Sequence, residues 1–382
     1  MAAYCQPRQV YEEGTNVRKK IAMTALLLLL ITVTSGCGFK DIDKRFFIVS
    51  TGIDMTGNSK LPYRITVRLA VPSPKIEPGA AKVQTESIEA KTIAEGVRLL
   101  KSQVDKELDF GHCKIFLFGE GFSHENIQDA LDWLARRRDV QMIADVAIAR
   151  PTAEAVLSIN PDSERYPGNN MLLTFGRDGT ESSYIVNAYI FDLFRRIGEK
   201  GLDPYVPIIY TQNNTYVIKH IAIMDKHRIK MILNPEETQL FNQLSRNFSK
   251  SSFACVVKGQ NYVIAVSSLR TTYRIITAPD KTSATLKMKI HIKGIFETAP
   301  KLSIEKDLSA LETELESQIS ASAAALLTKI QKTETDPFGF GLRYRATHYN
   351  KDADWQDWQR IYPNLKFEVK TNLTIEGSGL IK

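Results

Sequence analysis

The sequence lacks the short motifs around which the common catalytic sites are built. Its 382 residues contain no Walker A loop, no HExxH, no G-x-S-x-G and no CxxC pair. These absences argue against a P-loop nucleotide site, a zinc protease, an α/β-hydrolase and a thiol redox centre. The six histidines are scattered without the spacing of metal ligands. We therefore expect no enzyme activity, no metal site and no cofactor.

Cysteine is scarce, which excludes a disulfide framework. The chain has four cysteines, Cys5, Cys37, Cys113 and Cys255, too few for the cross-linked scaffold of a small secreted domain. Cys113 and Cys255 each lie in an apolar, strand-like run, where a reduced thiol packs as a small hydrophobic group. We expect both to be buried and free, and a disulfide between them is the alternative.

Long apolar runs are also nearly absent, and the single one lies close to the N-terminus. The uncharged run Ile21–Val33 follows the basic cluster Arg18–Lys20 and leads into the small residues Thr34–Gly36 and then Cys37. A basic start, a short apolar stretch and a small-residue exit are typical of an export signal. The run is shorter than the about 20 residues that a transmembrane helix needs. An uncleaved N-terminal anchor is the alternative.

The cysteine directly after two small residues resembles the lipobox of bacterial lipoproteins, although Thr34 stands where leucine is usual. In those proteins a diacylglyceryl group is attached to the thiol and the chain is cut before the cysteine. The resemblance implies a signal peptide over 1–36, lipidation of Cys37 and a tether over 37–45. Because Met1–Asn16 is polar and would lengthen the signal unusually, we expect the true start near Val17.

Positive charge is in modest excess. The formal net charge is +7, and residues 1–36 hold four basic and two acidic residues, which leaves +5 on the remainder. This excess suits an anionic membrane surface but is too small and too dispersed to indicate nucleic-acid binding. Arg136–Arg138 follows a predicted helix, where it would neutralise the helix dipole. A contact with phospholipid headgroups or with an acidic partner is the alternative for these arginines.

The periodicity predicts an α+β protein with more than one domain. From 46 to 200, apolar strand-like runs alternate with amphipathic helical stretches, which favours parallel βαβ units in an N-terminal α/β domain. Within it we expect a buried strand over Met142–Ala149 and a helix over Tyr184–Ile197. Glycines and a proline at 198–204 mark the predicted boundary to a C-terminal α+β domain over 204–382, with 204–267 and 268–382 as candidate subdomains.

Two strictly alternating runs predict the sheet of the C-terminal domain. Apolar and polar side chains alternate over 286–293 and over 365–375, which is typical of an antiparallel sheet with one solvated face. Between them, apolar residues at spacings of three and four predict a long helix from about Ile304 to Ile330, packed across the other face. Trp355 and Trp358 are expected to pack against this sheet, and a partner-facing aromatic patch is the alternative.

Several segments, taken in order, resemble the Ger(x)C family, the lipoprotein C subunits of GerA-type nutrient germinant receptors in endospore-forming bacteria. The segments that carry the resemblance are Ile48–Asp54, Thr92–Gly96, Gly111–Ile115, Leu131–Asp139, Asp203–Pro207 and, most specific, Asp336–Gly341 with the tryptophan segment after it. The family often has a Trp–Asp pair after the lipid cysteine, and here Gly38 and Phe39 take that place. The resemblance covers nearly the whole chain from Cys37 onwards.

The resemblance implies a non-catalytic subunit on the outer surface of the spore's inner membrane, held by the lipid on Cys37 beside integral-membrane A- and B-type receptor subunits. The assembly would sense germinants such as amino acids, sugars or nucleosides. An extracytoplasmic solute-binding lipoprotein is the alternative, but it needs two similar lobes, and the two halves are patterned differently. The loop after the long helix is expected to end that helix. A partner contact is the alternative for its residues Asp336, Phe338, Gly339 and Gly341.

Overall fold

The computed structural model describes residues 19–25, 44–71, 82–125, 127–161, 168–175, 182–279, 282–300, 308–349 and 353–377. The chain divides into two units, Met1–Arg45 and Phe46–Lys382. In the first unit residues 19–25 are helical, whereas the predicted cleavage site and Cys37 lie outside the described residues. No helix in the described ranges combines the length and the apolar character needed to cross a bilayer.

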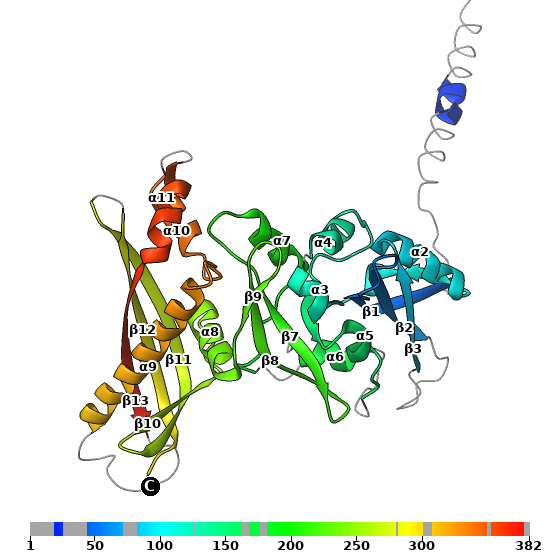
Figure 1. The fold of residues 1–382 in the computed structure, drawn as a ribbon. Coiled ribbons are helices and arrows are strands. Elements are labelled where there is room, and N and C mark those ends of the chain that lie inside the picture. The colour runs from blue at the N-terminus through cyan, green and yellow to red at the C-terminus, as the bar shows by residue number, and fades with distance from the viewer. Residues whose placement is uncertain are drawn as a thin grey trace, which may run out of the picture. The chain divides into compact units, whose positions relative to one another are not determined.

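The first sheet combines parallel and antiparallel strands (Figure 1). In the described residues it has nine strands in the order β3-β2-β1-β5-β6-β7-β8-β9, with β4 paired to β1. The central strands β1, β5, β6 and β7 are parallel to one another, and antiparallel strands extend the sheet on either side. The mixed sheet with βαβ units that the sequence predicts is thus confirmed. Its strands are β1 (Arg45–Met55), β2 (Tyr63–Val71), β3 (Lys82–Ala90), β4 (Glu107–Asp109), β5 (Ile115–Gly119), β6 (Asp145–Arg150), β7 (Tyr205–Gln212), β8 (Thr215–Met224) and β9 (Ile229–Ile232).

Helices cover both faces of this sheet because its central strands are apolar on both sides. Every residue of β5 is buried, with Phe116 and Phe118 in one core and Ile115 and Leu117 in the other. Side chains of α2, α3, α4 and α7 fill the first core, and those of α5 fill the second. A continuous apolar run is what a strand covered on both faces requires. The helices are α2 (Ile93–Gln103), α3 (Glu120–Glu125), α4 (Gln128–Ala135), α5 (Ala153–Leu157), α6 (Asn169–Thr174), α7 (Ile190–Gly198) and the 3-10 turn η2 (Phe110–His112).

The first sheet continues beyond the boundary predicted at 198–204. Strands β7, β8 and β9 follow that position in the chain, yet β7 pairs with β6 through Ile148 and Ile208. The link between the end of α7 at Gly198 and the start of β7 at Tyr205 therefore lies between two parts of one sheet layer. The division into 46–200 and 204–382, with its candidate subdomains, stays a prediction.

The second sheet is mixed and not purely antiparallel. In the described residues it has four strands in the order β10-β11-β12-β13. The pairs β10–β11 and β11–β12 are antiparallel, but β12 and β13 are parallel, so the predicted antiparallel sheet is wrong for this pair. The long helix α9 (Leu308–Gln331) connects β12 to β13 in the chain, and such a crossover returns the chain to the same end of a sheet. The strands are β10 (Ser252–Val257), β11 (Gln260–Thr277), β12 (Ala284–Thr298) and β13 (Lys366–Gly377).

Helix α9 packs across the second sheet, as its apolar seam predicts. Its buried residues include Leu315, Ile319, Ala323, Leu326 and Ile330, which recur every three or four positions on one face. They share one core with apolar side chains of all four strands. The remaining helices of this part are α8 (Pro235–Arg246), α10 (Phe340–Thr347), α11 (Ala353–Ile361) and the 3-10 turn η3 (Tyr362–Asn364).

Polar side chains of α9 cover both edges of the second sheet. Glu312 and Glu316 accept hydrogen bonds from backbone N–H groups of the edge strand β13 at 2.9 and 2.7 Å. Gln318 accepts from the N–H of Val256 on the other edge strand, β10, and donates to its C=O at 2.7 Å. Unpaired strand edges are templates for aggregation. The helix thus protects the sheet at both of its edges.

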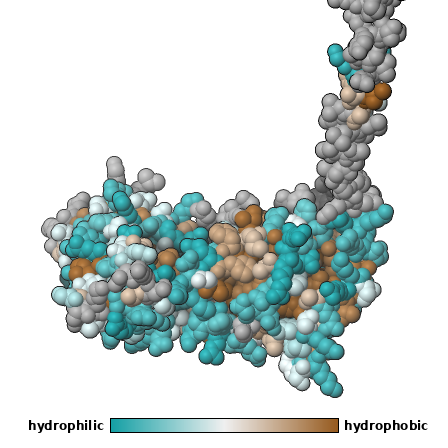
Figure 2. Space-filling view, turned by 90° about the horizontal axis from the view of Figure 1, so that it is seen from above, coloured by the Kyte–Doolittle hydropathy of each residue, from teal (hydrophilic) through white to brown (hydrophobic). Residues whose placement is uncertain are grey.

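Two segments beside the first sheet differ from the sequence prediction. Strand β6 begins at Asp145, and Met142 and Ile143 before it are exposed instead of buried. Helix α7 begins at Ile190 because Tyr189 before it is extended and forms an antiparallel bridge to Asp145. Short apolar runs do not distinguish strand, helix and exposed loop by periodicity alone. Apolar side chains gather in the middle of the face seen in Figure 2, bordered by hydrophilic ones.

Candidate functional site

The loop after α9 meets the link between α7 and β7. The Asp203 N–H donates to the Asp336 C=O at 2.9 Å, and the Asp336 N–H donates to the Asp203 carboxylate at 2.7 Å. A few residues on, the Leu342 N–H donates to the Gly201 C=O at 2.8 Å. We call the two segments 199–204 and 335–342 the junction. It joins the chain that enters the first sheet at β7 to the chain that leaves the long helix of the second.

The Asp336 carboxylate caps the N-terminus of α10. It accepts hydrogen bonds from the N–H groups of Gly339, Phe340 and Gly341 at 2.9, 3.0 and 2.7 Å. The residue is 3% exposed. Burial raises the pKa of Asp336 to about 7, and the neighbouring Asp203 adds to this rise, while the three N–H donors oppose it. Asp336, a candidate partner contact in the sequence, thus bonds to the chain's own backbone.

Glycines stand where the backbones of the junction come closest. Gly201 and Gly339 have φ angles of +79° and +76°, in the left-handed region that favours glycine. A Cβ on Gly341 would lie 2.3 Å from the indole Nε1 of Trp358 and 2.8 Å from the Cα of Gly201. No side chain fits in that space. The glycines of the predicted contact loop are therefore explained by packing within the chain.

The two tryptophans of α11 are placed differently. Trp358 is 2% exposed, and its ring centre lies 5.2 Å from that of Tyr344 and 5.4 Å from that of Tyr362. Trp355 is only partly buried against the same core, as is Phe338 in the junction. Trp355 and Phe338 are therefore the two candidate contact residues that keep appreciable exposed surface, and a partner contact through them stays a prediction.

Two cations that the sequence analysis does not single out hold the junction together. The Arg196 guanidinium donates to the C=O groups of Asp203 and Pro337 at 3.1 and 3.0 Å, and it lies 4.3 Å from the ring centre of Tyr205. Lys226 lies 3.1 Å from the Asp203 carboxylate and donates to three backbone C=O groups between 196 and 202. The only sequence signal near this arrangement is the resemblance of the segment beginning at Asp203 to the family. That resemblance does not indicate that Arg196 or Lys226 contacts the segment.

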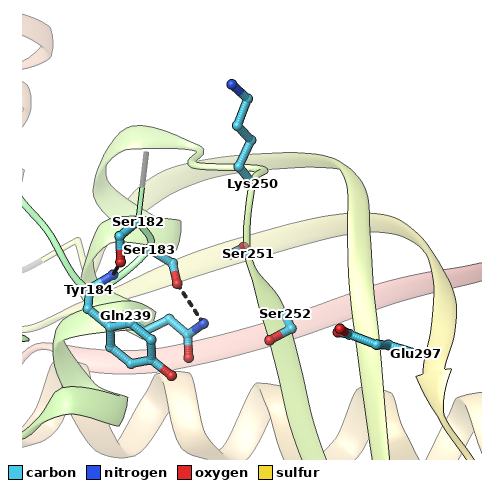
Figure 3. Close-up of a pocket in the computed structure, with 8 residues that line it drawn as sticks. All are labelled: Ser182, Ser183, Tyr184, Gln239, Lys250, Ser251, Ser252 and Glu297. Carbon is cyan, nitrogen blue, oxygen red and sulfur yellow. Dashed lines mark hydrogen bonds between the residues drawn. The ribbon is translucent and has the colours of Figure 1, made fainter. Parts of the chain in front are cut away.

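A polar pocket lies where the segment 182–184 meets α8 and β10 (Figure 3). Its volume is about 410 Å³. The Gln239 Nε2 donates to the Ser183 hydroxyl at 2.9 Å, while the Lys250 side chain points away from the serines. Hydroxyl and amide groups of this kind bind polar groups, but the lining holds no histidine and no pair of carboxylates for acid–base chemistry. The lining residues are Ser182, Ser183, Tyr184, Gln239, Lys250, Ser251, Ser252 and Glu297.

Cys113 and Cys255 are the two cysteines among the described residues. Both are buried and free, as the sequence predicts. Burial raises the pKa of Cys113 to about 12 and that of Cys255 to about 11. Because the thiolate is the reactive form, neither thiol is a nucleophile at neutral pH. Among the residues that the structure describes, no group of three His, Cys, Asp or Glu side chains is arranged to hold a metal ion.

Comparison with known proteins places both parts of the chain in one family. Residues 38–211 match the spore germination protein N-terminal domain, and residues 219–379 match the spore germination B3/GerAC like C-terminal domain. Among similar proteins is the spore germination protein GerQC of Bacillus cereus, 23% identical over 79% of this chain and 84% of its own. Another is the spore germination protein KC of Bacillus subtilis (strain 168), 24% identical over 95% of this chain and 97% of its own.

A solved structure supports the same assignment at the level of the fold. The crystal structure of the GerBC protein matches with a TM-score of 0.57 and 14% identity, and the match covers 89% of this chain and all of that one. It confirms the predicted α+β, multi-domain fold. Together with the two domain matches, which leave few residues after Cys37 unassigned, it identifies this chain as a member of the Ger(x)C family of spore germination proteins.

Proposed function

We propose that this chain is the lipid-anchored C-type subunit of a spore nutrient-germinant receptor, non-catalytic and located on the outer surface of the spore's inner membrane. The observation that carries the proposal is where the family match begins. It starts at residue 38, directly after Cys37, and runs with one short gap to residue 379. Everything before Cys37 is then the part that a lipoprotein loses on maturation.

Anchoring gives the subunit a physical role in receptor assembly. One acyl chain binds a membrane only marginally, whereas two chains on one cysteine hold a protein there stably. An anchored ectodomain has a high effective concentration at integral-membrane partners, which are the A- and B-type receptor subunits in this proposal. The junction supports this role because it links both sheets through hydrogen bonds of 2.7–3.0 Å and an ion pair of 3.1 Å between buried and partly buried groups.

The decisive experiment replaces the predicted lipid attachment site in spores. When a detergent extract is separated into two phases, the Cys37→Ala variant is expected to move from the detergent phase to the aqueous phase. Spores with this variant are also expected to lose the germination response to nutrients. The matched control is Cys5→Ala, which alters a cysteine in the predicted discarded segment and is expected to change neither property. If Cys37→Ala leaves both membrane association and nutrient germination unchanged, the anchor and the receptor role are both refuted.

A second measurement separates assembly from anchoring. Mass spectrometry of the N-terminal peptide from wild-type spores is expected to show a diacylglyceryl group on Cys37. Cross-linking in the same membranes is expected to join the chain to the A- and B-type subunits. A lipidated chain that cross-links to neither subunit would refute the receptor role and leave the anchor standing.

A further inference from the structure

An exposed apolar patch flanked by arginines lies where the chain approaches β6. Met142, Ile143 and Phe191 are 37%, 48% and 48% exposed. The Phe191 N–H donates to the Met142 C=O at 2.9 Å, so the two segments are held side by side. Figure 2 shows apolar side chains gathered in the middle of one face of the molecule, with hydrophilic ones around them. We call Met142, Ile143 and Phe191 the apolar patch.

Arginines accompany the patch on both of its segments. Arg136 and Arg138 are exposed and precede Met142 by only a few residues. Arg195 lies four positions after Phe191 on α7, a spacing that places both on one helix face, and its side chain is 50% exposed. Acidic side chains are also present and pair with several of these arginines, but the five arginines at 136–138, 195 and 196 outnumber the three aspartates. The pairs are Arg136 with Asp132, Arg137 with Asp139, and Arg195 and Arg196 with Asp192.

The strand directions place the patch at the end of the sheet from which the chain leads back to Cys37. Strands β1, β5 and β6 are parallel, with Ser50 beside Ile115 and Ile115 beside Asp145. The residues before each of these positions therefore lie at the same end of the sheet. At that end lie the first residues of β1 and, just before β6, Met142 and Ile143.

The number of residues between Cys37 and β1 limits how far this end of the sheet can lie from the proposed lipid anchor. Residues 37–45 separate the predicted lipid from the sheet, and a fully extended chain of that length spans about 30 Å.

We propose that the apolar patch and its arginines form a second membrane contact, which inserts Met142, Ile143 and Phe191 among the headgroups of an anionic lipid surface. The proposal rests on the proposed lipid anchor for the reach of the tether. Exposed apolar side chains beside arginines are the combination that binds anionic lipid interfaces. A protein partner fits less well, because three half-exposed side chains provide much less than the roughly 800 Å² that each partner of a specific interface buries. The contact orients the ectodomain, which attachment through a single lipidated residue does not.

The test uses the full-length, lipidated chain reconstituted in vesicles whose lipids carry brominated acyl chains, which quench nearby indoles. The Phe191→Trp variant is expected to lose about half of its added fluorescence, as for a side chain 5–10 Å into the interface. The matched control is Gln212→Trp, an exposed position at the end of β7 and thus at the opposite end of the parallel strands. Its added fluorescence is expected to stay unchanged.

A second set of variants, made in the Phe191→Trp protein, tests whether the arginines are needed for the quenching. On vesicles of phosphatidylcholine with phosphatidylglycerol, Arg136→Gln/Arg138→Gln is expected to reduce the quenching to the level seen with phosphatidylcholine alone. The control Arg270→Gln/Arg274→Gln removes the same charge from exposed positions on β11 and is expected to have no effect.

Three results would overturn the proposal: no quenching at position 191, equal quenching at positions 191 and 212, or the same quenching at position 191 with and without phosphatidylglycerol in the vesicles. Protection of position 191 only when the membrane subunits are present would instead assign the patch to a protein partner. Mass spectrometry of the same sample reports the lipid on Cys37. A lipidated chain without quenching therefore refutes the patch alone, and a chain without lipid refutes the anchor.

Discussion

The carboxyl group of Asp336 should make the junction weaken as the pH rises. The perturbation is Asp336→Asn, which keeps the size of the side chain and one acceptor oxygen but removes the titrating group. Burial raises the pKa of Asp336 from 3.8 to about 7. The folded chain thus holds this proton more tightly than the unfolded chain does. The stabilisation that this bound proton gives is complete below the pKa of the unfolded chain. It is lost as the pH rises through the pKa of Asp336 in the folded chain.

The size of the effect follows from the shift. About three pKa units correspond to about 4 kcal/mol between the two ends of the titration. Between pH 4.5 and 7.5, which covers most of that window, the free energy of unfolding of the wild type should fall by about 3 kcal/mol relative to Asp336→Asn. Urea denaturation of both proteins, followed by tryptophan fluorescence at several pH values, measures this difference directly, because all other titrating groups cancel.

Asp105→Asn, an exposed site after α2, is the matched control and should give a difference from wild type that does not change with pH. A flat difference for Asp336→Asn would refute a raised pKa at this site. A difference that grows in favour of the wild type with rising pH would mean that the three N–H donors outweigh burial and lower the pKa instead.

Three further predictions test packing, edge protection and thiol reactivity. Gly341→Ala should lower the free energy of unfolding by about 2 kcal/mol or more, because its Cβ would lie 2.3 Å from an indole nitrogen, whereas Gly377→Ala, with no atom within 4 Å of its Cβ, should cost little in the same urea titration. Glu316→Ala should leave a β13 N–H uncovered, cost about 1 kcal/mol and raise aggregation measured by light scattering, while the exposed neighbour Glu314→Ala should not. Cys113, with its pKa raised to about 12, should resist labelling by iodoacetamide at pH 8 until the chain is unfolded. If Cys113 in the folded protein is labelled as fast as an exposed thiol, its buried placement is contradicted.

The sequence predicts those elements whose pattern is local. The seam of α9 is visible because Leu315, Ile319 and Leu326 recur with the helical period, and the same residues are buried in the structure. Strand β5 is visible because both faces of it are apolar. The start of α2 also has a local signal, because threonine is a preferred N-cap residue and the Thr92 side chain accepts the N–H of Glu95 at 3.1 Å.

The parts that the sequence does not predict depend on contacts between distant segments. Alternation is the same in parallel and antiparallel strands, so the parallel pairing of β13 with β12 follows only from the path of α9. The start of α7 is set by the bridge between Tyr189 and Asp145, 44 positions apart. The junction pairs Asp203 with Asp336, 133 positions apart. No local pattern encodes such a pairing, and a family motif marks the segments without saying that they touch.

Helix α7 carries Phe191 of the apolar patch and Arg196, which bonds to the junction, and this allows membrane contact to be separated from folding. Phe191 is 48% exposed, so Phe191→Ser should change the free energy of unfolding by less than about 1 kcal/mol. Arg196 is 9% exposed and bonds to Asp192, Asp203 and Pro337, so Arg196→Ala should cost about 3 kcal/mol, because it removes charge-assisted hydrogen bonds to two backbone C=O groups while Asp192 keeps Arg195 as a partner. A loss of lipid contact in Phe191→Ser at unchanged stability can then only come from the surface. Equal destabilisation by both variants in urea would show that Phe191 belongs to the core, and the membrane role of the patch would be refuted.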